Sequence, residues 1–346
     1  MNALGNLRGK LIIGLVLGLV VVAGLSVYAD FNKMLEVLRH FEWGLVPFIL
    51  LFTLFNYALR FYKWDVYLRL IGATGVPKRT SLLIFLSGFA MAMTPGKVGE
   101  ILKSYLLRQV RGTPIATSAP IVMAERLTDG VAMLVLASVG LFLFNYGTAV
   151  LIGIAIFVLI FVFVFQNRAL AARLLSMGER LPVISKVVHH ISAFYESSYE
   201  LFKLPNLLFG VAIGVISWSG EVAAFVLVMM GLGIPFSALL VVICAFILSA
   251  STLIGSVTLL PGGLGSTDAS ITGMLLFLVP GQLHLAQPFS QTAAVAATLL
   301  VRFATLWFGV IIGLIALTLT QRHLHDVPPA EEEMGTVSDR LARAER

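Results

Sequence analysis

The sequence is poor in charged residues and in cysteine. Lys, Arg, Asp and Glu make up 12% of its 346 residues, whereas hydrophobic residues make up 58%. Soluble domains carry about a quarter of their residues as charges, so this balance excludes a soluble domain and predicts a polytopic membrane protein. The one cysteine, Cys244, lies in an apolar run. It excludes a disulfide within the chain and a multi-cysteine metal site, and we expect it to be a small buried hydrophobic residue.

Signatures of common enzymes and of nucleic-acid binding are also missing. There is no Walker sequence, no Gly-x-Ser-x-Gly and no His-Glu-x-x-His. His189 and His190 are adjacent and would point apart on a helix, so we expect neither a metal site nor a cofactor. The net charge of +6 comes without a basic patch interleaved with aromatics. We therefore expect a non-enzymatic, transporter-like protein that does not bind nucleic acid.

What the sequence does contain is a series of long apolar runs. A helix needs about 20 apolar residues to span a bilayer. The first run is about 19 residues, longer than the 7–15 of a signal peptide, so we expect it to be retained as a helix. The six predicted spans are Leu11–Ala29, Trp43–Leu59, Thr117–Asn145, Val150–Phe165, Leu207–Leu232 and Gln291–Thr320.

Two further apolar stretches are interrupted by glycine-rich turns, which predicts two re-entrant helical hairpins. The first turn, Thr94-Pro-Gly-Lys-Val-Gly-Glu100, is also charged. The second, Pro261-Gly-Gly-Leu-Gly-Ser-Thr-Asp268, has a similar spelling. The expected arms are Leu82–Met93 and Val98–Leu107 for the first hairpin, and Phe236–Leu260 and Ile271–Val279 for the second.

Basic residues concentrate in cytoplasmic loops, and their positions predict a topology. The basic groups are Arg8/Lys10, Arg60–Arg79, Lys103–Arg111 and Arg168–Lys186. They place both termini of an inner-membrane, multi-pass protein in the cytoplasm, with hairpin one entering from the cytoplasm and hairpin two from outside. Residues of about 43–145 and about 206–320 then form two repeats of opposite orientation. Inverted repeats with broken helices are a transporter arrangement.

The remaining segments are a surface helix and a tail. Within residues 186–203, Leu201 and Phe202 belong to an apolar face, and Glu196, Ser197 and Glu200 to the opposite polar face. We expect this amphipathic helix to lie on the membrane surface or on the bundle. Residues 1–322 are expected to form one transmembrane domain, and residues 323–346 a disordered cytoplasmic tail.

Charged residues in or beside the apolar runs need partners. A charge at the bilayer centre costs about 2.5–3.5 kcal/mol on insertion scales, so we expect these side chains to pair or to line a wet cavity. Helical spacing lets Arg126 reach Asp129 and Glu100 reach Lys103. Structural ion pairs and functional charges both remain open. The set is Lys97, Glu100, Glu125, Arg126, Asp129, Glu221, Asp268 and Arg302.

The two turns predict an anion site. Thr94 and Ser266 are expected to cap the helices that follow them. Helix N-termini near the middle of the membrane, together with Lys97, Arg126 and Arg302, would bind a phosphate group. Plain turns in tight helix packing are the alternative. The glycines that would let the backbone approach the phosphate are Gly96, Gly99, Gly262, Gly263 and Gly265.

Five motifs resemble the lysylphosphatidylglycerol synthase transmembrane-domain family over about residues 8–320. They are Asn56-x-x-x-Arg60-x-x-x-Trp64, the Thr94–Glu100 turn, Glu125-Arg-Leu-x-Asp129, Pro261-Gly-Gly-Leu-Gly265 and Arg302. The resemblance implies a flippase-like domain that moves a lipid with a phosphate-containing head group between leaflets. The family's second turn is usually followed by glutamate, where this chain has Asp268. The aminoacyl-transferase domain of bifunctional relatives has no counterpart after Thr320.

The expected function is therefore transport of an anionic phospholipid or a polyprenyl-phosphate lipid by a flippase or scramblase. Alternatives are a membrane enzyme or accessory subunit in lipid-linked sugar or aminoacyl-lipid metabolism, and a scaffold. Partners to consider are a second copy of the chain, a glycosyltransferase and an aminoacyl-lipid synthase. The expected substrate-binding residues are Arg60, Pro95, Gly96, Lys97, Gly99, Glu100, Lys103, Arg126, Pro261, Gly262, Gly263, Gly265, Ser266 and Arg302. The expected gating or proton-coupling residues are Glu125, Asp129, Glu221 and Asp268.

Overall fold

The computed structural model confirms the predicted fold class. It describes residues 2–94, 101–141, 147–167, 188–258, 260–283 and 289–325. Every regular element within these ranges is a helix. Among the described residues, five helices are long and apolar enough to cross a membrane, or six if a pair bent by 92° near residue 30 counts as one span. The chain is an all-α polytopic membrane protein.

The helices follow one another with short connections. The first half contains α1 (Asn2–Tyr28), α2 (Phe31–Arg39), η1 (Trp43–Leu45), α3 (Val46–Leu70), α4 (Lys78–Ala90), η2 (Met91–Met93), α5 (Leu102–Arg111) and α6 (Ile115–Leu141). The second half contains α7 (Gly147–Gln166), α9 (Val188–Leu201), α10 (Leu204–Gly231), α11 (Ala238–Val257), η5 (Pro261–Gly263), α12 (Ser266–Gln282), α13 (Gln291–Arg302), η6 (Phe303–Trp307) and α14 (Phe308–His325).

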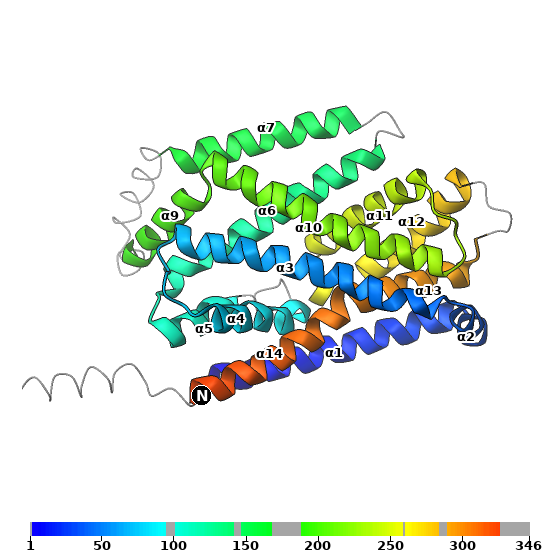
Figure 1. The fold of residues 1–346 in the computed structure, drawn as a ribbon, viewed down its shortest axis with the longest axis horizontal. Coiled ribbons are helices and arrows are strands. Elements are labelled where there is room, and N and C mark those ends of the chain that lie inside the picture. Colours follow the sequence, from blue (N-terminus) through cyan, green and yellow to red (C-terminus); the bar gives the residue numbers. More distant parts are fainter. Residues whose placement is uncertain are drawn as a thin grey trace, which may run out of the picture.

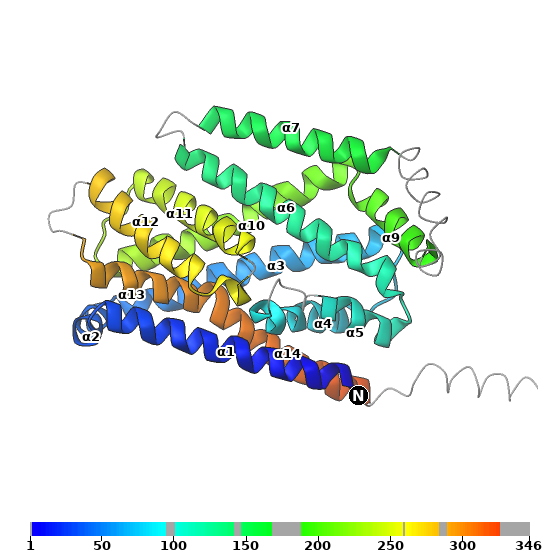
Figure 2. The same ribbon diagram turned by 180° about the vertical axis from the view of Figure 1, so that it is seen from behind.

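The two hairpins point toward each other from opposite ends of the bundle (Figures 1 and 2). α4 and α5 lie at one end, and α11 and α12 at the other. Their tips meet, since η2 contacts η5. The first hairpin has arms of 13 and 10 residues, and the second has arms of 20 and 17. The meeting point therefore lies inside the bundle, away from both ends.

Long helices from the two halves pack in a crossed pattern. α3 runs along α10, α4 along α14, and α11 along α6. The first arm of each hairpin, α4 or α11, thus packs on a long helix of the other half. The buried hydrophobic residues form two main clusters: one holds α3, α4, α5 and the first turns of α6 together, the other α10, α11, α12 and α13.

Small residues allow the closest of these helix crossings. A Cβ at Gly313 of α14 would lie 2.2 Å from the backbone nitrogen of Ala90, at the end of α4. Without the hydrophobic effect between lipid-embedded helices, close van der Waals approach at small residues is what holds them together. Gly313 therefore fixes the first hairpin against α14 next to the hairpin tip.

Three details differ from the sequence-based predictions. α3 does not end near Leu59 but continues to Leu70, so Arg60 and Lys63 lie inside the helix and not in a loop. The amphipathic helix is observed as α9, packed on α6 and α3. Ser197 is buried there instead of facing outward. α14 extends to His325, and residues 326–346 lie outside the described ranges.

We expect Gly313→Ala to destabilise the fold, because overpacking a tight contact costs about 1–3 kcal/mol. Gly273→Ala is the matched control: it also lies in a helix, α12, and a Cβ there meets nothing within 4 Å. Thermal unfolding of the purified protein in detergent measures both. Gly273→Ala should melt at or above the wild-type temperature. Equal melting temperatures of the two variants would contradict tight packing between Gly313 and the end of α4.

Candidate functional site

A cavity of about 140 Å³ lies where the two hairpin tips meet. Its wall combines both halves: α3, α4, η2 and α6 contribute from the first, and α10 to α14 from the second. Among the described residues, the charged ones in the wall are Arg60, Arg126, Arg302 and Glu221. Three guanidinium groups and one carboxylate thus line the described part of the cavity.

Arg60 offers its guanidinium group to this cavity. The group lies between two aromatic rings, 5.5 Å from the centroid of Phe89 and 5.6 Å from that of Trp218. Its ion pair is loose, with Nη2 at 3.5 Å from Asp129 Oδ2. Within the described residues Arg60 donates no hydrogen bond that meets normal geometry. The aromatic rings orient the cation, and most of its five N–H donors remain for a ligand.

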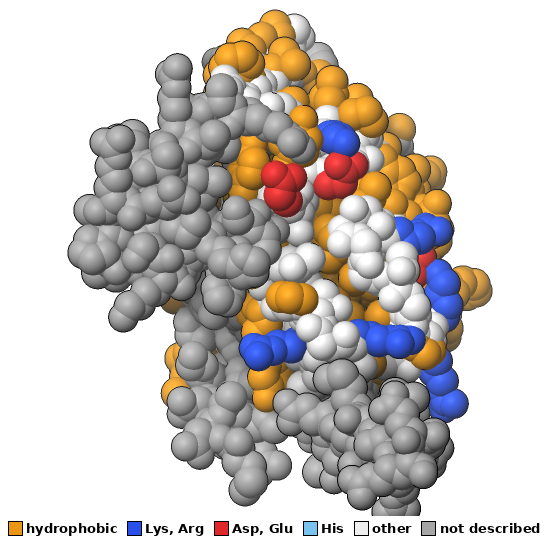
Figure 3. All heavy atoms as spheres, turned by 90° about the vertical axis from the view of Figure 1, so that its left-hand side faces the viewer, with side chains coloured by type: hydrophobic (Ala, Val, Ile, Leu, Met, Phe, Trp, Pro, Cys, Tyr) orange, Lys and Arg blue, Asp and Glu red, His pale blue; other side chains and the backbone are white. Residues whose placement is uncertain are grey.

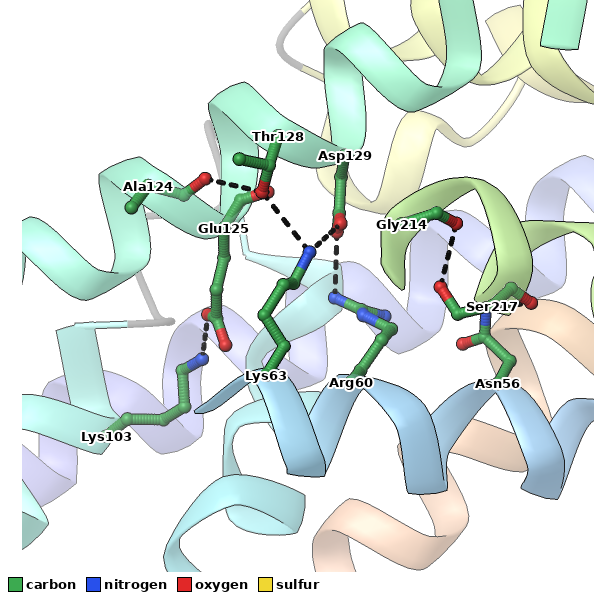
Figure 4. Close-up of polar contacts among 10 residues, drawn as sticks. All are labelled: Asn56, Arg60, Lys63, Lys103, Ala124, Glu125, Thr128, Asp129, Gly214 and Ser217. Atoms are coloured by element: carbon green, nitrogen blue, oxygen red, sulfur yellow. Dashed lines mark hydrogen bonds and ion pairs between the residues drawn. The ribbon is translucent and has the colours of Figure 1, made fainter. Parts of the chain in front are cut away.

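Asp129 is held mainly by a buried lysine. Lys63 Nζ lies 2.5 Å from Asp129 Oδ1 and donates to Thr128 Oγ1 at 3.2 Å. Figure 4 shows Arg60 and Lys63 pointing from α3 to the same carboxylate on α6. The Lys63 side chain is fully buried. This ion pair satisfies the lysine and positions Arg60 at the cavity edge.

A second buried ion pair lies farther from the cavity. Lys103 of α5 pairs with Glu125 of α6 (Figure 4). The ammonium group also lies 4.7 Å from the ring centroid of Trp64 and 5.5 Å from that of Phe85. Neither Lys103 nor Glu125 belongs to the cavity wall. The pair joins the second arm of hairpin one to α6.

Arg302 stabilises the second glycine-rich turn. Its Nε donates to Asp268 Oδ1 at 2.9 Å, and its Nη2 donates to the Gly262 carbonyl at 2.7 Å. Asp268 Oδ2 accepts the Gly265 N–H at 2.8 Å, so this aspartate caps α12. The prediction that Ser266 is the cap is wrong. Its hydroxyl bonds to Thr258 and to the Gly263 carbonyl instead.

Backbone conformation explains the glycines of this turn. Gly262, Gly263 and Gly265 all have positive φ angles of 59°, 65° and 82°, a region that residues with a Cβ rarely adopt. Gly262 and Gly263 line the cavity, whereas Gly265 does not. The turn thus places backbone, instead of side chains, against the cavity.

Glu221 is the one carboxylate in the described cavity wall. It comes from α10, is 2% exposed, and accepts one hydrogen bond, from Thr53 Oγ1 at 3.3 Å. It makes no ion pair within the described residues. No group of three His, Cys, Asp or Glu residues in the described ranges could hold a metal ion.

The predicted site residues fall into three groups. The structure brings six of them to the cavity: Arg60, Arg126, Glu221, Gly262, Gly263 and Arg302. Seven lie around it without lining it: Lys103, Glu125, Asp129, Pro261, Gly265, Ser266 and Asp268. Five lie outside the described residues: Pro95, Gly96, Lys97, Gly99 and Glu100.

Comparison with known proteins identifies the family. The lysylphosphatidylglycerol synthase TM region matches residues 15–313. The chain belongs to this family. It is also similar to proteins from Methanothermobacter thermautotrophicus described as UPF0104 membrane proteins. One is 23% identical over 288 residues, covering 77% of this chain and 83% of the relative. Another is 25% identical over 337 residues, covering 90% and 95%.

Membership in the lysylphosphatidylglycerol synthase TM region family makes a lipid-related membrane function plausible.

Three residues at the site were not predicted from the sequence: Lys63, Tyr57 and Trp218. Lys63 follows Arg60 by three positions and Asn56 by seven, so all three share one face of α3. If the predicted helix had been extended past Leu59, the sequence would have shown this shared face. No spacing signal pointed to Tyr57 or Trp218, because aromatic residues are common throughout the apolar runs.

We expect Lys103→Met and Glu125→Leu to be strongly destabilising as single substitutions. Removing one partner leaves an uncompensated buried charge, at a cost of about 3–5 kcal/mol. The double variant has no charge left at this pair and should recover most of the loss. Thermal unfolding of the four proteins in detergent forms the cycle. Additive losses in the double variant would mean that the two groups do not act as a pair.

Proposed function

We propose that the protein is a lipid transporter of the flippase or scramblase type, and not an enzyme. It moves a phospholipid, or a lipid-linked polyprenyl-phosphate or glycolipid, between the leaflets of the inner membrane. The observation that carries this proposal is the cavity at the meeting point of the hairpins, where Arg60, Arg126 and Arg302 face a single carboxylate, Glu221.

The charge of the cavity favours an anionic head group. Three of the four charged side chains in its described wall are arginines: Arg60, Arg126 and Arg302. A phosphate group would place negative charge beside them, and guanidinium binds phosphate through paired charge-assisted hydrogen bonds.

The crossed packing supports movement of the two halves against each other. α4 packs on α14, α11 packs on α6, and α3 packs along α10. This symmetric pairing of helices from the two halves is the pattern expected of two inverted repeats. In transporters of this kind the substrate site lies at the repeat interface near the midplane. The cavity has that position relative to the two hairpins.

Surface charge supports a cytoplasmic position for the end that carries hairpin one. Figure 3 views this end and shows Lys and Arg side chains gathered there, with few acids among the coloured residues. Exposed basic residues of its helices include Arg69, Lys78, Arg79, Arg108 and Arg111. The N-terminus and the end of α14 lie at the same end (Figure 1). We infer from the positive-inside rule that both face the cytoplasm.

Arg60→Ala should slow lipid movement at least about tenfold, because a charge-assisted hydrogen bond contributes about 1.5–3 kcal/mol. The assay uses liposomes with fluorescent phosphatidylglycerol, whose outer-leaflet label is quenched chemically over time. Arg69→Ala is the control: Arg69 lies on the same helix but is 59% exposed and pairs with Asp65. Its transport should equal that of the wild type.

Two results would contradict the proposal. The first is wild-type protein that moves no labelled lipid faster than empty liposomes. The second is Arg60→Ala transport at the wild-type rate. Mass spectrometry of the same liposomes separates transport from catalysis, since a lipid of altered mass would indicate a membrane enzyme.

A further inference from the structure

We propose that Glu221 is a proton-binding site, and that the protein takes up one proton with each anionic lipid that enters the cavity. The inference rests on the proposed function and specifies how lipid movement is coupled to protons. The Glu221 carboxylate takes the proton from water in the cavity and becomes a carboxylic acid, and no other bond changes. Glu221 is suited to this role by its lack of a cation partner, by the hydroxyl group beside it and by the polar wall around it.

Pairing distinguishes Glu221 from the other buried carboxylates. Each of the others forms an ion pair with a cation on a different helix: Lys63–Asp129 at 2.5 Å, Lys103–Glu125, and Arg302–Asp268 at 2.9 Å. Glu221 is 2% exposed and makes no ion pair within the described residues. An ionised carboxylate buried without a cation is costly, whereas the protonated acid is neutral. Among these four carboxylates, Glu221 is thus the one that can gain a proton without breaking a described ion pair.

The Thr53 hydroxyl group can serve both protonation states of Glu221. Its Oγ1 lies 3.3 Å from Glu221 Oε2 and 3.4 Å from the carbonyl oxygen of Ile49. A hydroxyl group has one proton to donate and can also accept. It donates to Glu221 when the carboxylate is charged. When Glu221 is protonated, the acid donates to Thr53, which then donates to Ile49. Rotation of one hydroxyl group therefore adapts the site to either state.

The wall around Glu221 can hold the water that exchanges this proton. Asn56 Oδ1, Tyr57 Oη and Trp218 Nε1 are buried, line the same cavity and make no hydrogen bond within the described residues. Trp218 precedes Glu221 by three positions on α10, so the two share a helix face. The cavity of about 140 Å³ has room for several water molecules, each of which occupies about 30 Å³ of the liquid. Water bound to these atoms can supply and receive the proton.

Other titratable groups near Glu221 come from the helices packed on α10. Those that line the cavity with it are Arg60 and Tyr57 of α3, Arg126 of α6 and Arg302 of α13. Asp129 of α6 and Cys244 of α11 lie on helices that contact α10 but outside the cavity wall. The described wall residues of α11 and α12 carry no titratable side chain, and α9 and η1 do not line the cavity. Glu221 thus shares the wall with arginines and one tyrosine.

A bound phosphate group links the proton to the lipid. It places a negative charge beside the arginines of the wall that also contains Glu221. Two anions close together each disfavour the other's charged form, so Glu221 gains a proton as the lipid enters and loses it as the lipid leaves. A singly charged phosphodiester and one proton together carry no net charge. Their joint movement therefore lowers the cost of passing a charged head group through an apolar bundle.

Proton uptake on lipid binding tests this site directly. The probe is dioctanoyl phosphatidylglycerol, a phosphodiester that lacks the second ionisation of a phosphomonoester at about pH 6. Isothermal titration calorimetry of the protein in detergent, in buffers of different ionisation enthalpy, counts the protons taken up between about pH 5 and about pH 9. We expect wild-type uptake to reach about one proton per lipid within this range. Where uptake occurs, lipid affinity should fall by up to about tenfold for each unit that the pH rises.

Glu221→Gln and Glu221→Asp form a matched pair of variants. Glutamine has the shape of the protonated acid and does not titrate, so Glu221→Gln should bind the lipid without proton uptake and with a pH-independent affinity. Glu221→Asp keeps a titratable carboxyl group and should retain the uptake. Melting temperatures without lipid show that both variants are folded. Glu36→Gln is the control, because Glu36 is exposed on α2, outside the cavity; its uptake should equal that of the wild type.

The contrary results separate the proton site from the transporter proposal. Wild-type protein that binds the lipid without proton uptake at every pH overturns the site, and this result needs no variant. Unchanged uptake in Glu221→Gln overturns it as well, by assigning the titration to another group, and so does a lack of lipid binding at every pH. Lipid movement in liposomes without proton uptake leaves the transporter proposal standing and the proton site refuted. Proton uptake on binding without lipid movement does the reverse.

Discussion

The cost of burying charge in an apolar bundle is the constraint on which this structure depends. Lys63–Asp129, Lys103–Glu125 and Arg302–Asp268 are three buried ion pairs, and each joins different helices. The first connects α3 to α6, the second α5 to α6, and the third α12 to α13. Because an unpaired charge at this depth is unfavourable, each pair restricts how its helices can be arranged. Together they hold both hairpins against long helices.

The same constraint explains why the cavity can be functional. Arg302 is anchored by Asp268 and a backbone carbonyl, whereas Arg60 has one loose ion pair, with Asp129, whose closer partner is Lys63. Because two cations share this carboxylate, Arg60 is only weakly paired. Anchored charges thus support the fold, and a weakly anchored one remains for an anion. The strength of its ion pair, more than its charge, thus distinguishes an arginine that supports the fold from one that remains available to an anion.

Sequence reasoning succeeded where hydrophobic periodicity and amino-acid composition determine the structure. Apolar runs and glycine turns predicted the helices and the two interrupted stretches, and the cost of buried charge predicted that Glu125, Asp129, Glu221, Asp268 and Arg302 are buried. It failed where contacts between residues far apart in the sequence determine the structure. Lys63 looked like the end of a span, because charge along a sequence does not show that an aspartate lies 2.5 Å away on another helix. Asp268 displaced Ser266 as the cap for the same reason: its second oxygen is fixed by Arg302.

A transport site has to select its cargo without retaining it. Arginine–phosphate pairs alone would bind any anionic lipid, and more of them would slow release. Hydrogen bonds exchanged with water contribute little net free energy each, about 0.5–1.5 kcal/mol, because water replaces the cargo when it leaves. Asn56, Tyr57 and Trp218 carry unpartnered polar atoms and lie in the same cavity wall as Arg60, so weak hydrogen bonds can form there beside the arginine–phosphate pairs without making release slow.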